Sequence, residues 1–396
     1  LIIFAIYPLT VPETPGKFDL RLLYLVSHPI QYQAPLLRLI ARDDDIQLSV
    51  LFEHMGSTRA HYDQGFETEI SWDTNLTDGY VHNVVTSVTE VEDNLRGTDV
   101  LWVHGWDTWL KRRVLKVARR LRVPILMRGE NTLNAMPDGP HLRGVLKRAY
   151  LTSIFRHCRG FLCIGSDNRA YYASHGVEPA RLFEMPYAVD NAAFQMASRG
   201  SGIRARELYG LEAERPIILF AGKFLKRKNP ALLLEACRRL DREKTRDPYL
   251  VFVGEGEEGA RLRDLSSDLD WVRFLGFRNQ SELPSIYAMS DVFALPSRNE
   301  PWGLAVNEAM ACGTAVISTD QCGCSADLVD DLVGRSVPAD DCDALVAALT
   351  DVLAEAGASE AMGRAAQERI ATWGYAEDIA GLKAALTAVG AMPSPA

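Results

Sequence analysis

One pattern repeats along most of the 396 residues: a short apolar run followed by a stretch with helical spacing. Continuous apolar runs are typical of strands that are buried on both faces of a parallel sheet. Because these runs alternate with helices, the sequence predicts a doubly wound α/β fold. The runs that we predict as strands in the first half are 22–26, 46–52, 99–104, 123–128, 160–165 and 182–186.

The pattern restarts in the second half, so the sequence predicts two α/β domains in tandem. A chain of this length exceeds what one hydrophobic core usually supports. A cleft between two such domains, at the carboxyl ends of the strands, is the expected ligand site. We expect a first domain at 20–195, a second domain at 196–374, and a C-terminal helix and tail at 375–396 that return toward the first domain. The second-half strands are predicted at 216–222, 249–254, 272–276, 292–296 and 314–318.

Residues 1–19 precede the pattern, and we expect a loose extension there. They begin with an apolar run, but no basic residue precedes this run, and Pro8 and Pro12 interrupt it. It is therefore too short to span a bilayer and makes a poor signal peptide. The seven cysteines show no paired disulfide pattern, which suits a reducing compartment. We expect a cytoplasmic protein.

Glu300 and Glu308 lie on either side of a predicted helix start. Gly303 and the apolar residues after it are typical of a loop that enters a helix. Two carboxylates at such a place can hold the hydroxyls of a sugar. The exposed N–H groups of the helix N-terminus, together with the helix dipole, favour a phosphate. This segment predicts a site for a sugar that is joined to a phosphate.

A basic loop at 222–230 lies between a predicted strand and a predicted helix, and it holds four cations and no acid. Lys223 and Lys228 could clamp a diphosphate and neutralise the charge of a departing nucleotide. The alternative is an exposed basic loop without a ligand. The two glutamates described above favour the diphosphate interpretation.

Residues 254–259 match the GxGxxG dinucleotide pattern and follow a predicted strand. Three glutamates would project around a loop that has to receive a pyrophosphate, and like charges repel. The motif also lies in the second half of the chain. We therefore favour a surface turn here over the cofactor site of a dehydrogenase.

Several short stretches of the second half carry a family resemblance. They are 220–223 with Lys228, 253–256, 274–277, 294–297, 300–304 and 308–313, and the segment 186–190 with Phe194 is similar to an interdomain linker. With them the chain resembles the retaining nucleotide-sugar glycosyltransferases of family four. The resemblance covers about residues 20–390 and is most specific in the second half. It implies the GT-B fold, in which two Rossmann-like domains face each other across a cleft.

The resemblance implies a role for each donor-side position. Lys223 and Lys228 would bind the diphosphate, Glu300 would contact the hydroxyls of the donor sugar, and Glu308 would contact the ribose. Backbone near Phe277 would meet the base. The implied donor-binding residues, which include backbone groups at the helix start and a locally packed tryptophan, are Gly222, Lys223, Lys228, Phe277, Glu300, Trp302, Gly303, Leu304 and Glu308.

The acceptor side departs more from the family. Relatives often place a histidine after the strand that precedes Arg128 and Glu130, and this chain has none there. His28 and His104 follow other strands and are candidates to line the cleft, although each could equally be a hydrogen-bonded loop histidine. We expect acceptor-side contacts from His28, Gln31, Arg128 and Glu130. The expected catalytic residues are Lys223, Lys228, Glu300 and His104.

The implied activity is that of a hexosyltransferase-type enzyme that moves a sugar from a nucleotide diphosphate-sugar to a hydroxyl acceptor with retention of configuration. The acceptor hydroxyl would attack from the side that the nucleotide leaves, so that catalysis rests on positioning and on stabilising the leaving charge. We expect no metal and no cofactor, since the nucleotide sugar is a co-substrate. Asp43–Asp45 and Cys322–Cys324 are interpreted as a turn and a loop. The acceptor would be a saccharide, a lipid-linked compound or a small molecule, in polysaccharide, glycolipid or metabolite synthesis.

Charge is unevenly distributed along the chain. The net charge of −9 argues against nucleic-acid binding. Residues 111–160 nevertheless hold thirteen Lys or Arg and two acids, a balance of +11, so the remainder is −20 (−9 minus +11). We expect the basic residues at 111–159 to face an anionic membrane or a lipid phosphate, at the inner face of the cell membrane. A helix with one buried face and one solvated basic face is the open alternative.

Two other functions fit the same fold. A GT-B nucleotide-sugar epimerase would consume the nucleotide sugar without an acceptor, so an assay that lacks an acceptor separates it from a transferase. A non-catalytic protein that binds a sugar or a lipid phosphate would keep its cellular activity after substitution of Glu300 and Lys228.

Overall fold

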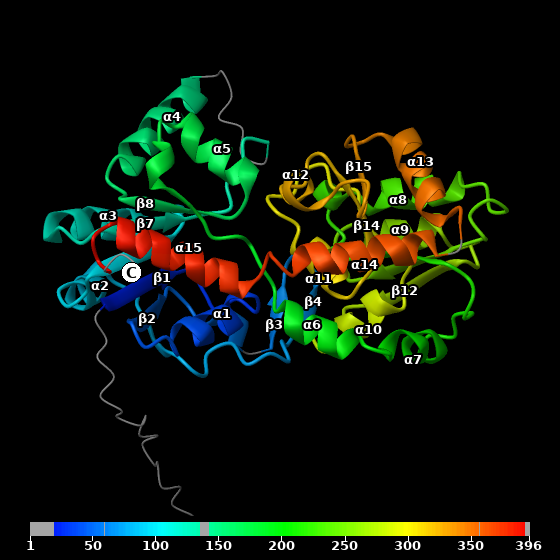
Figure 1. The fold of residues 1–396 in the computed structure, drawn as a ribbon, viewed down its shortest axis with the longest axis horizontal. Coiled ribbons are helices and arrows are strands. Elements are labelled where there is room, and N and C mark those ends of the chain that lie inside the picture. The colour runs from blue at the N-terminus through cyan, green and yellow to red at the C-terminus, as the bar shows by residue number, and fades with distance from the viewer. Residues whose placement is uncertain (1–19, 59, 135–141, 356, 393–396) are drawn as a thin grey trace, which may run out of the picture.

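Two parallel sheets follow one another along the chain, and each has helices on its faces (Figure 1). The computed structural model describes residues 20–58, 60–134, 142–355 and 357–392. The extension expected at 1–19 and the last four residues of the expected tail lie outside the described residues. We call the first sheet with its helices the first domain, and the second sheet with its helices the second domain. In the part of the chain that the structure describes, no helix combines the length and the apolar character needed to cross a membrane.

The first sheet has seven strands in the order β5-β2-β1-β6-β7-β8-β9, and every neighbouring pair is parallel. Its helices cover both faces because side chains alternate along each strand. One face packs on α2, α3, α4 and α5, and the other packs on α1 and α15. The elements are β1 (Leu20–Val26), α1 (Gln33–Ile40), β2 (Ile46–Phe52), β5 (Val81–Val84), α2 (Val88–Leu95), β6 (Val100–His104), α3 (Trp109–Leu121), β7 (Ile125–Arg128), α4 (Leu142–Phe155), β8 (Gly160–Cys163), α5 (Ser166–Ser174), β9 (Leu182–Glu184) and α15 (Tyr375–Ala388).

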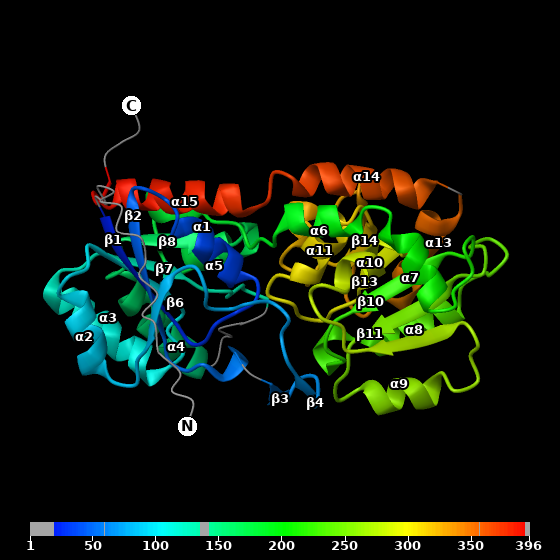
Figure 2. The ribbon, with the colours of Figure 1, turned by 90° about the horizontal axis from the view of Figure 1, so that it is seen from below.

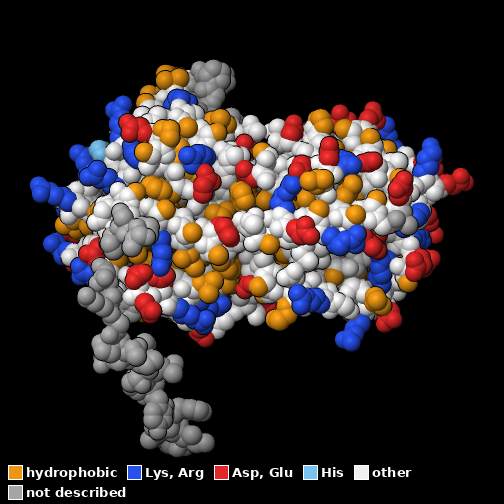
Figure 3. All heavy atoms as spheres, viewed as in Figure 1, with side chains coloured by type: hydrophobic (Ala, Val, Ile, Leu, Met, Phe, Trp, Pro, Cys, Tyr) orange, Lys and Arg blue, Asp and Glu red, His pale blue; other side chains and the backbone are white. Residues whose placement is uncertain are grey.

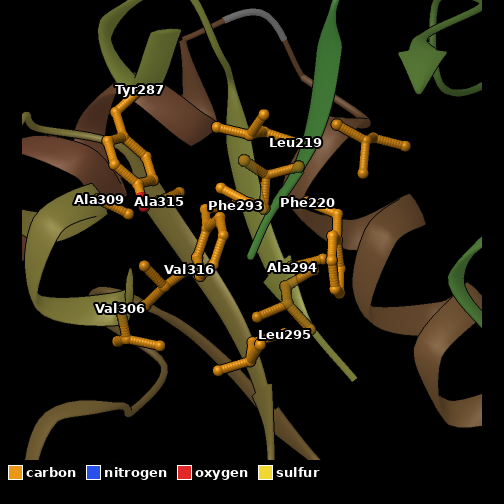
Figure 4. Close-up of a cluster of buried hydrophobic side chains, with 14 of the residues drawn as sticks. Leu219, Phe220, Tyr287, Phe293, Ala294, Leu295, Val306, Ala309, Ala315 and Val316 are labelled. Carbon is orange, nitrogen blue, oxygen red and sulfur yellow. The ribbon is translucent and has the colours of Figure 1, made fainter. Parts of the chain in front are cut away.

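The second sheet has six parallel strands in the order β12-β11-β10-β13-β14-β15. Figure 4 shows its core, where Phe293 and Val316 of the central strands lie beside Tyr287, Val306 and Ala309 of two helices. The elements are α6 (Asn191–Ser198), α7 (Ser201–Leu208), β10 (Ile217–Ala221), α8 (Pro230–Arg238), β11 (Tyr249–Val253), α9 (Gly259–Leu265), β12 (Val272–Gly276), α10 (Leu283–Ala288), β13 (Val292–Leu295), α11 (Leu304–Ala311), β14 (Ala315–Thr319), α12 (Ser325–Leu328), β15 (Gly334–Val337), α13 (Cys342–Leu353) and α14 (Ala358–Ile370).

Every strand that the sequence predicts coincides with an observed strand, and the doubly wound α/β class is confirmed. The pattern missed β5, β15 and a small antiparallel hairpin made of β3 (His61–Asp63) and β4 (Thr68–Ile70). These segments are three or four residues long and carry polar side chains, and β5 and β15 lie at sheet edges. Short edge strands of this kind give no continuous apolar run.

The last helix returns to the first domain. In Figure 2, α14 lies along the second domain and α15 continues in nearly the same direction along the first. Leu382 and Leu386 of α15 are buried in the core on one face of the first sheet. Under this helix, Arg128 of β7 contacts Asp378, with Nη2 and Oδ1 3.3 Å apart and both residues no more than 2% exposed. The helix is therefore fixed to the first sheet by apolar packing and by one buried ion pair.

The Asp378→Ala substitution should destabilise the first domain, because it leaves the guanidinium of Arg128 buried without its carboxylate partner. The expected loss is about 3 kcal/mol of the free energy of unfolding. Burial raises the pKa of Asp378 to about 7, so urea denaturation followed by circular dichroism should be run at pH 8, where the carboxylate is ionised.

The matched control is Lys383→Ala on the same helix, which removes a partly exposed pair with Asp43. Exposed pairs contribute less than about 1 kcal/mol. Equal effects of the two substitutions would show that the buried pair does not hold the helix in place.

Candidate functional site

A cleft of about 650 Å³ lies between the two domains. Its walls come from segments that follow β1, β7, β10 and β13, at the carboxyl ends of both sheets. The strand order reverses between β1 and β6 and again between β10 and β13, and ligands of open α/β sheets bind at such points. The predicted site residues that line the cleft are His28, Gln31, Glu130, Gly222, Lys223, Lys228, Phe277, Glu300, Trp302, Gly303, Leu304 and Glu308.

The carboxylate of Glu300 lies between two cations of the basic loop. Its Oε2 is 2.9 Å from Nζ of Lys228 and 2.9 Å from Nη1 of Arg227. Glu300 is 8% exposed, so the pairs are shielded from most of the solvent. Sequence reasoning gave no role to Arg227, although the run of cations at 226–228 was the available signal. The arrangement places two positive charges and one carboxylate at the entrance of α11.

The backbone turns sharply before α11. Gly303 has φ +107°, and a Cβ at this position would lie 3.1 Å from a methyl carbon of Leu295. Only glycine adopts this conformation without strain. The turn makes Leu304 the first residue of α11. The N–H groups of Leu304 and Ala305, which no helical carbonyl can pair, lie beside the cleft, while the N–H of Val306 donates to the Gly303 carbonyl.

Glu308 lies one turn further into α11 and is 2% exposed. The Tyr287 hydroxyl donates a hydrogen bond to its Oε2 at 2.7 Å, and Nε2 of Gln280 lies 3.5 Å from Oε1. Burial raises the pKa of Glu308 to about 7, and these hydrogen bonds oppose the rise only in part. The carboxylate thus changes its charge near neutral pH.

Trp302 packs locally, as expected, although part of it reaches the cleft wall. Its ring stacks on Trp373 with a centroid distance of 5.5 Å, and its Nε1 donates to Asn307 at 2.9 Å. Asn307 in turn donates to the backbone carbonyl of Tyr187, in the segment that links the domains. These contacts fix the helix start to the linker.

Glu130 reaches the cleft from the first domain, and His104 lies behind it. The Tyr187 hydroxyl donates to Oε1 of Glu130 at 2.5 Å, and Nε2 of His104 lies 3.7 Å from the same oxygen. Burial opposes ionisation of Glu130, but the hydrogen bond and charge of His104 outweigh it, so the pKa of Glu130 is lowered. On its other side, Nδ1 of His104 is 3.0 Å from the Tyr24 hydroxyl and 3.3 Å from Nε2 of Gln33. His104 is thus a hydrogen-bonded histidine that supports Glu130 and does not line the cleft.

Arg128 does not line the cleft, in contrast to our expectation of an acceptor-side contact. Its side chain lies under α15, where it pairs with Asp378 and donates to the carbonyl oxygens of Met185 and Pro186 at 3.3 and 3.2 Å. It occupies the last position of β7, and it points to the face of the sheet that α15 covers. Its role is structural.

The other acceptor-side candidates do line the cleft. His28 stacks on His54 with a centroid distance of 5.2 Å and nearly parallel rings. Burial and the nearby charge of His54 lower the pKa of His28. Gln31 lies beside them on the loop that follows β1. This wall presents polar groups that can hydrogen-bond a hydroxylated acceptor.

The start of the 254–259 motif reaches the cleft, which the surface-turn interpretation did not foresee. Gly254 lines the cleft. The three glutamates of the motif are engaged locally: Glu255 pairs with Arg263, Glu258 pairs with Arg261, and Glu257 accepts from the backbone of Lys226.

One further wall was missed by sequence reasoning. The hairpin of β3 and β4 projects from the first domain and contacts the second, where Asp63 pairs with Lys223 and Phe66 packs on Phe277. Its two strands are three residues long, and none of the stretches that carry the family resemblance includes it. The sequence therefore offered no signal for this contact.

The basic stretch divides into two different surfaces. On α3 most apolar residues, such as Leu110 and Val114, are buried and most basic residues are solvated, which is the ordinary amphipathic arrangement. The exceptions are Trp109, which is 57% exposed, and Lys111, which is 2% exposed. The first half of α4 exposes apolar residues: Leu142, Val145 and Leu146 are between 55% and 74% exposed, whereas Leu151 and Phe155 further along the helix are buried. Figure 3 shows hydrophobic side chains over α4, next to basic side chains of the same end of the molecule.

Comparison with known proteins identifies a family for the second domain. The family described as Glycosyl transferases group 1 matches residues 204–369. A mannosyltransferase of Mycolicibacterium smegmatis, described as GDP-mannose-dependent alpha-(1-6)-phosphatidylinositol monomannoside mannosyltransferase, is 33% identical over 205 residues, which are 49% of this chain and 53% of the relative. A D-inositol 3-phosphate glycosyltransferase of Mycobacteroides abscessus is 29% identical over 285 residues, which are 69% of this chain and 61% of the relative. The chain thus spans about half to three-fifths of the length of these two relatives.

Solved structures show the same fold over nearly the whole chain. HepE of Anabaena, solved in complex with UDP and glucose, has a TM-score of 0.72 at 15% identity and covers 93% of this chain and 99% of its own. A glycosyltransferase of Rickettsia africae has a TM-score of 0.74 at 13% identity, with 93% and 98% covered. The chain has the GT-B fold, and its residues 204–369 match the Glycosyl transferases group 1 family.

The raised pKa of Glu308 predicts how stability depends on pH. The value of about 7 lies above the ordinary 4.5, so the folded state binds more protons than the unfolded state between these two values. This contribution to the free energy of unfolding is therefore greatest in acid and is lost as the pH rises toward 7, by on the order of 3 kcal/mol in total. The Glu308→Gln variant should lack it.

The measurement is the melting temperature of wild type and Glu308→Gln between pH 5 and pH 8. The variant should gain stability relative to wild type as the pH rises, while Asp378 remains the same in both proteins. Glu235→Gln, on the exposed face of α8, serves as the control. A constant difference between Glu308→Gln and wild type across this range would contradict the raised pKa.

Proposed function

We propose that the chain is a glycosyltransferase that moves a sugar from a nucleotide diphosphate-sugar to a hydroxyl acceptor. The observation that carries the proposal is the placement of Glu300 between Lys228 and Arg227, at the N-terminus of α11 and inside a GT-B cleft. Cations and free N–H groups favour a diphosphate there, and a carboxylate beside them can accept hydrogen bonds from sugar hydroxyls. The family match of residues 204–369 supports the same class.

In the proposed donor site, different residues bind the diphosphate, the transferred sugar and the ribose. The diphosphate lies against Lys223, Lys228 and the first turn of α11, which stabilise the charge that develops on the leaving group. Glu300 accepts from the hydroxyls of the transferred sugar, and Glu308 accepts from the ribose. Lys223, Lys228 and the helix terminus supply this stabilisation, and on this basis we propose a reaction without a metal or a cofactor.

The acceptor is proposed to enter against the wall made by His28, Gln31 and Glu130. Its hydroxyl attacks from the face that the diphosphate leaves, so the product keeps the anomeric configuration of the donor. The named relatives act on a phosphatidylinositol mannoside and on D-inositol 3-phosphate. We propose a lipid-linked, saccharide or small-molecule acceptor of this polyhydroxylated kind, in the synthesis of a cell-surface glycan, a glycolipid or a glycosylated metabolite.

The test is incubation of the full chain with UDP-, GDP- and ADP-sugars, with and without a panel of polyol and lipid acceptors. A bound donor should raise the melting temperature, and product should form only when an acceptor is present, with the anomeric configuration read by NMR. Conversion of the nucleotide sugar without an acceptor would instead identify an epimerase. Absence of both binding and turnover with every donor would refute the proposed activity.

Lys228→Ala should reduce kcat by about a hundredfold to a thousandfold, because one of the groups that stabilise the leaving diphosphate is lost. Lys226→Ala is the matched control, since Lys226 lies in the same short loop and its side chain is exposed. The measurement compares initial rates of the two variants and wild type, with the donor that binds wild type. Equal activity of the two variants would remove Lys228 from the leaving-group site.

We further propose that the protein works at the cytoplasmic face of a membrane, which it contacts through α4. Exposed Leu142, Val145 and Leu146 alternate there with the basic side chains of Arg143 and Lys147, a combination that suits an anionic lipid surface. The basic face of α3 adds positive charge without exposed aliphatic residues.

The double substitution Val145→Glu and Leu146→Glu should weaken binding to vesicles of phosphatidylglycerol and phosphatidylcholine by about tenfold, because it removes apolar contact and adds negative charge. Leu208→Glu places the same kind of charge at a leucine of α7 that is 77% exposed, and it should have little effect. Co-sedimentation at two salt concentrations measures both. If neither variant loses binding, α4 is excluded as the membrane contact.

A further inference from the structure

The hairpin of β3 and β4, with the loop up to Trp72, is held against the second domain by several specific contacts. We call residues 61–73 the hairpin segment. The side-chain amide of Asn279 donates to the carbonyl of Ser71 at 2.7 Å and accepts from the backbone of Asp73 at 3.2 Å. The backbone of Ser281 donates to the Asp73 carboxylate at 3.1 Å. The first domain therefore reaches across the cleft at one defined place.

The approach of the hairpin segment is close enough to require glycine. Gly256 has φ +145°, and a Cβ there would lie 2.7 Å from the carbonyl oxygen of Gly65. Any larger residue at Gly256 would push the segment away from the second domain. The glycine after β11 thus allows the hairpin segment to pack closely against the second domain.

Asp63 engages the cation that we assign to the donor diphosphate. Its two oxygens lie 2.8 and 2.9 Å from Nζ of Lys223, so the pair is bidentate. The same carboxylate accepts from the backbone N–H groups of Gly65 and Phe66 at 2.8 and 3.0 Å. An anion fixed by its own turn therefore holds Lys223, which a diphosphate can bind only by competing with it.

Aromatic rings surround the neighbouring part of the cleft. Phe66 and Trp72 of the hairpin segment meet Phe277 edge-on, with centroid distances of 5.0 and 5.8 Å. All three rings line the cleft. Rings contributed by both domains form a pocket that can stack or edge-pack a flat heterocycle.

We propose that the hairpin segment is the nucleotide-recognition element of the donor site: Phe66, Trp72 and Phe277 hold the nucleobase, and Asp63 competes with the donor diphosphate for Lys223. This inference rests on the proposed function. The diphosphate displaces Asp63 from Lys223, while the base gains contacts with the rings of the same segment. Donor binding thereby exchanges one anchor of the segment for another, and the first domain takes part in recognising the nucleotide.

The test compares binding of nucleoside diphosphates (UDP, GDP and ADP) with binding of inorganic pyrophosphate, which has no base, by isothermal titration calorimetry of the full chain. Asp63→Asn should tighten the binding of pyrophosphate and of the preferred nucleoside diphosphate about threefold to tenfold, because a competing anion is removed. Trp72→Ala should weaken the nucleoside diphosphate about tenfold and leave pyrophosphate nearly unchanged.

Two control variants lie on the same hairpin. Glu69→Gln removes an exposed charge and Tyr62→Ala removes an exposed ring, and both should bind like wild type. Melting temperatures verify that every variant is folded. Weaker or unchanged binding by Asp63→Asn, or equal losses for both ligands in Trp72→Ala, would overturn the inference while the proposed function stands. If wild type binds no nucleoside diphosphate, the proposed function itself fails and this inference fails with it.

Discussion

The donor side of the cleft depends on how Glu300 is charged and held. Its carboxylate is buried, and burial of an isolated charge is costly. The positive charges of Lys228 and Arg227 compensate that cost. The backbone of Glu300 is held separately, by hydrogen bonds with the backbone of Gln321 and Gly323. Because the cations come from the loop after β10 and the carboxylate from the loop after β13, this one cluster fixes the two loops on either side of the point where the strand order reverses. The same cluster thereby fixes the position at which α11 begins, because the loop after β13 leads directly into this helix.

The donor side is also connected to the rest of the molecule. Trp302 donates to Asn307, and Asn307 donates to the carbonyl of Tyr187 in the linker. The Tyr187 hydroxyl in turn donates to Glu130. Glu130 is supported in turn by His104. A chain of contacts therefore runs from the loop that carries Glu300 to Glu130 on the opposite wall, through residues of both domains. Changes at the linker should be expected to affect both walls.

Residues whose position is set by the local sequence pattern could be predicted. Lys223, Lys228, Glu300, Gly303 and Glu308 lie within loops and one helix whose local pattern places them, and the structure brings them all to the cleft. The central strands were found because they are mostly apolar. The assignments of these residues to parts of the donor remain predictions.

Residues whose position depends on distant contacts were harder to place. Arg128 and Glu130 are two positions apart, yet one lies under α15 and the other faces the cleft, because the direction of each side chain is set by elements far away in the sequence. His104 lies at the carboxyl end of β6, as a cleft residue would, but Tyr24 and Gln33 hold it behind Glu130. The hairpin segment has no apolar run and no motif, so only the folded chain reveals that it touches the second domain.

Glu300 and Glu308, eight residues apart, show how one helix start can give two carboxylates different properties. Glu300 has two cations within 2.9 Å, so its negative charge is balanced at the place that we propose for the donor diphosphate. Glu308 is surrounded by neutral donors, Tyr287 and Gln280, and burial raises its pKa to about 7. An unbalanced second carboxylate would repel the same diphosphate, whereas a carboxyl that is protonated for part of the time near neutral pH repels it less. The pair can therefore offer hydrogen-bonding oxygens on both sides of a diphosphate without placing two full negative charges beside it.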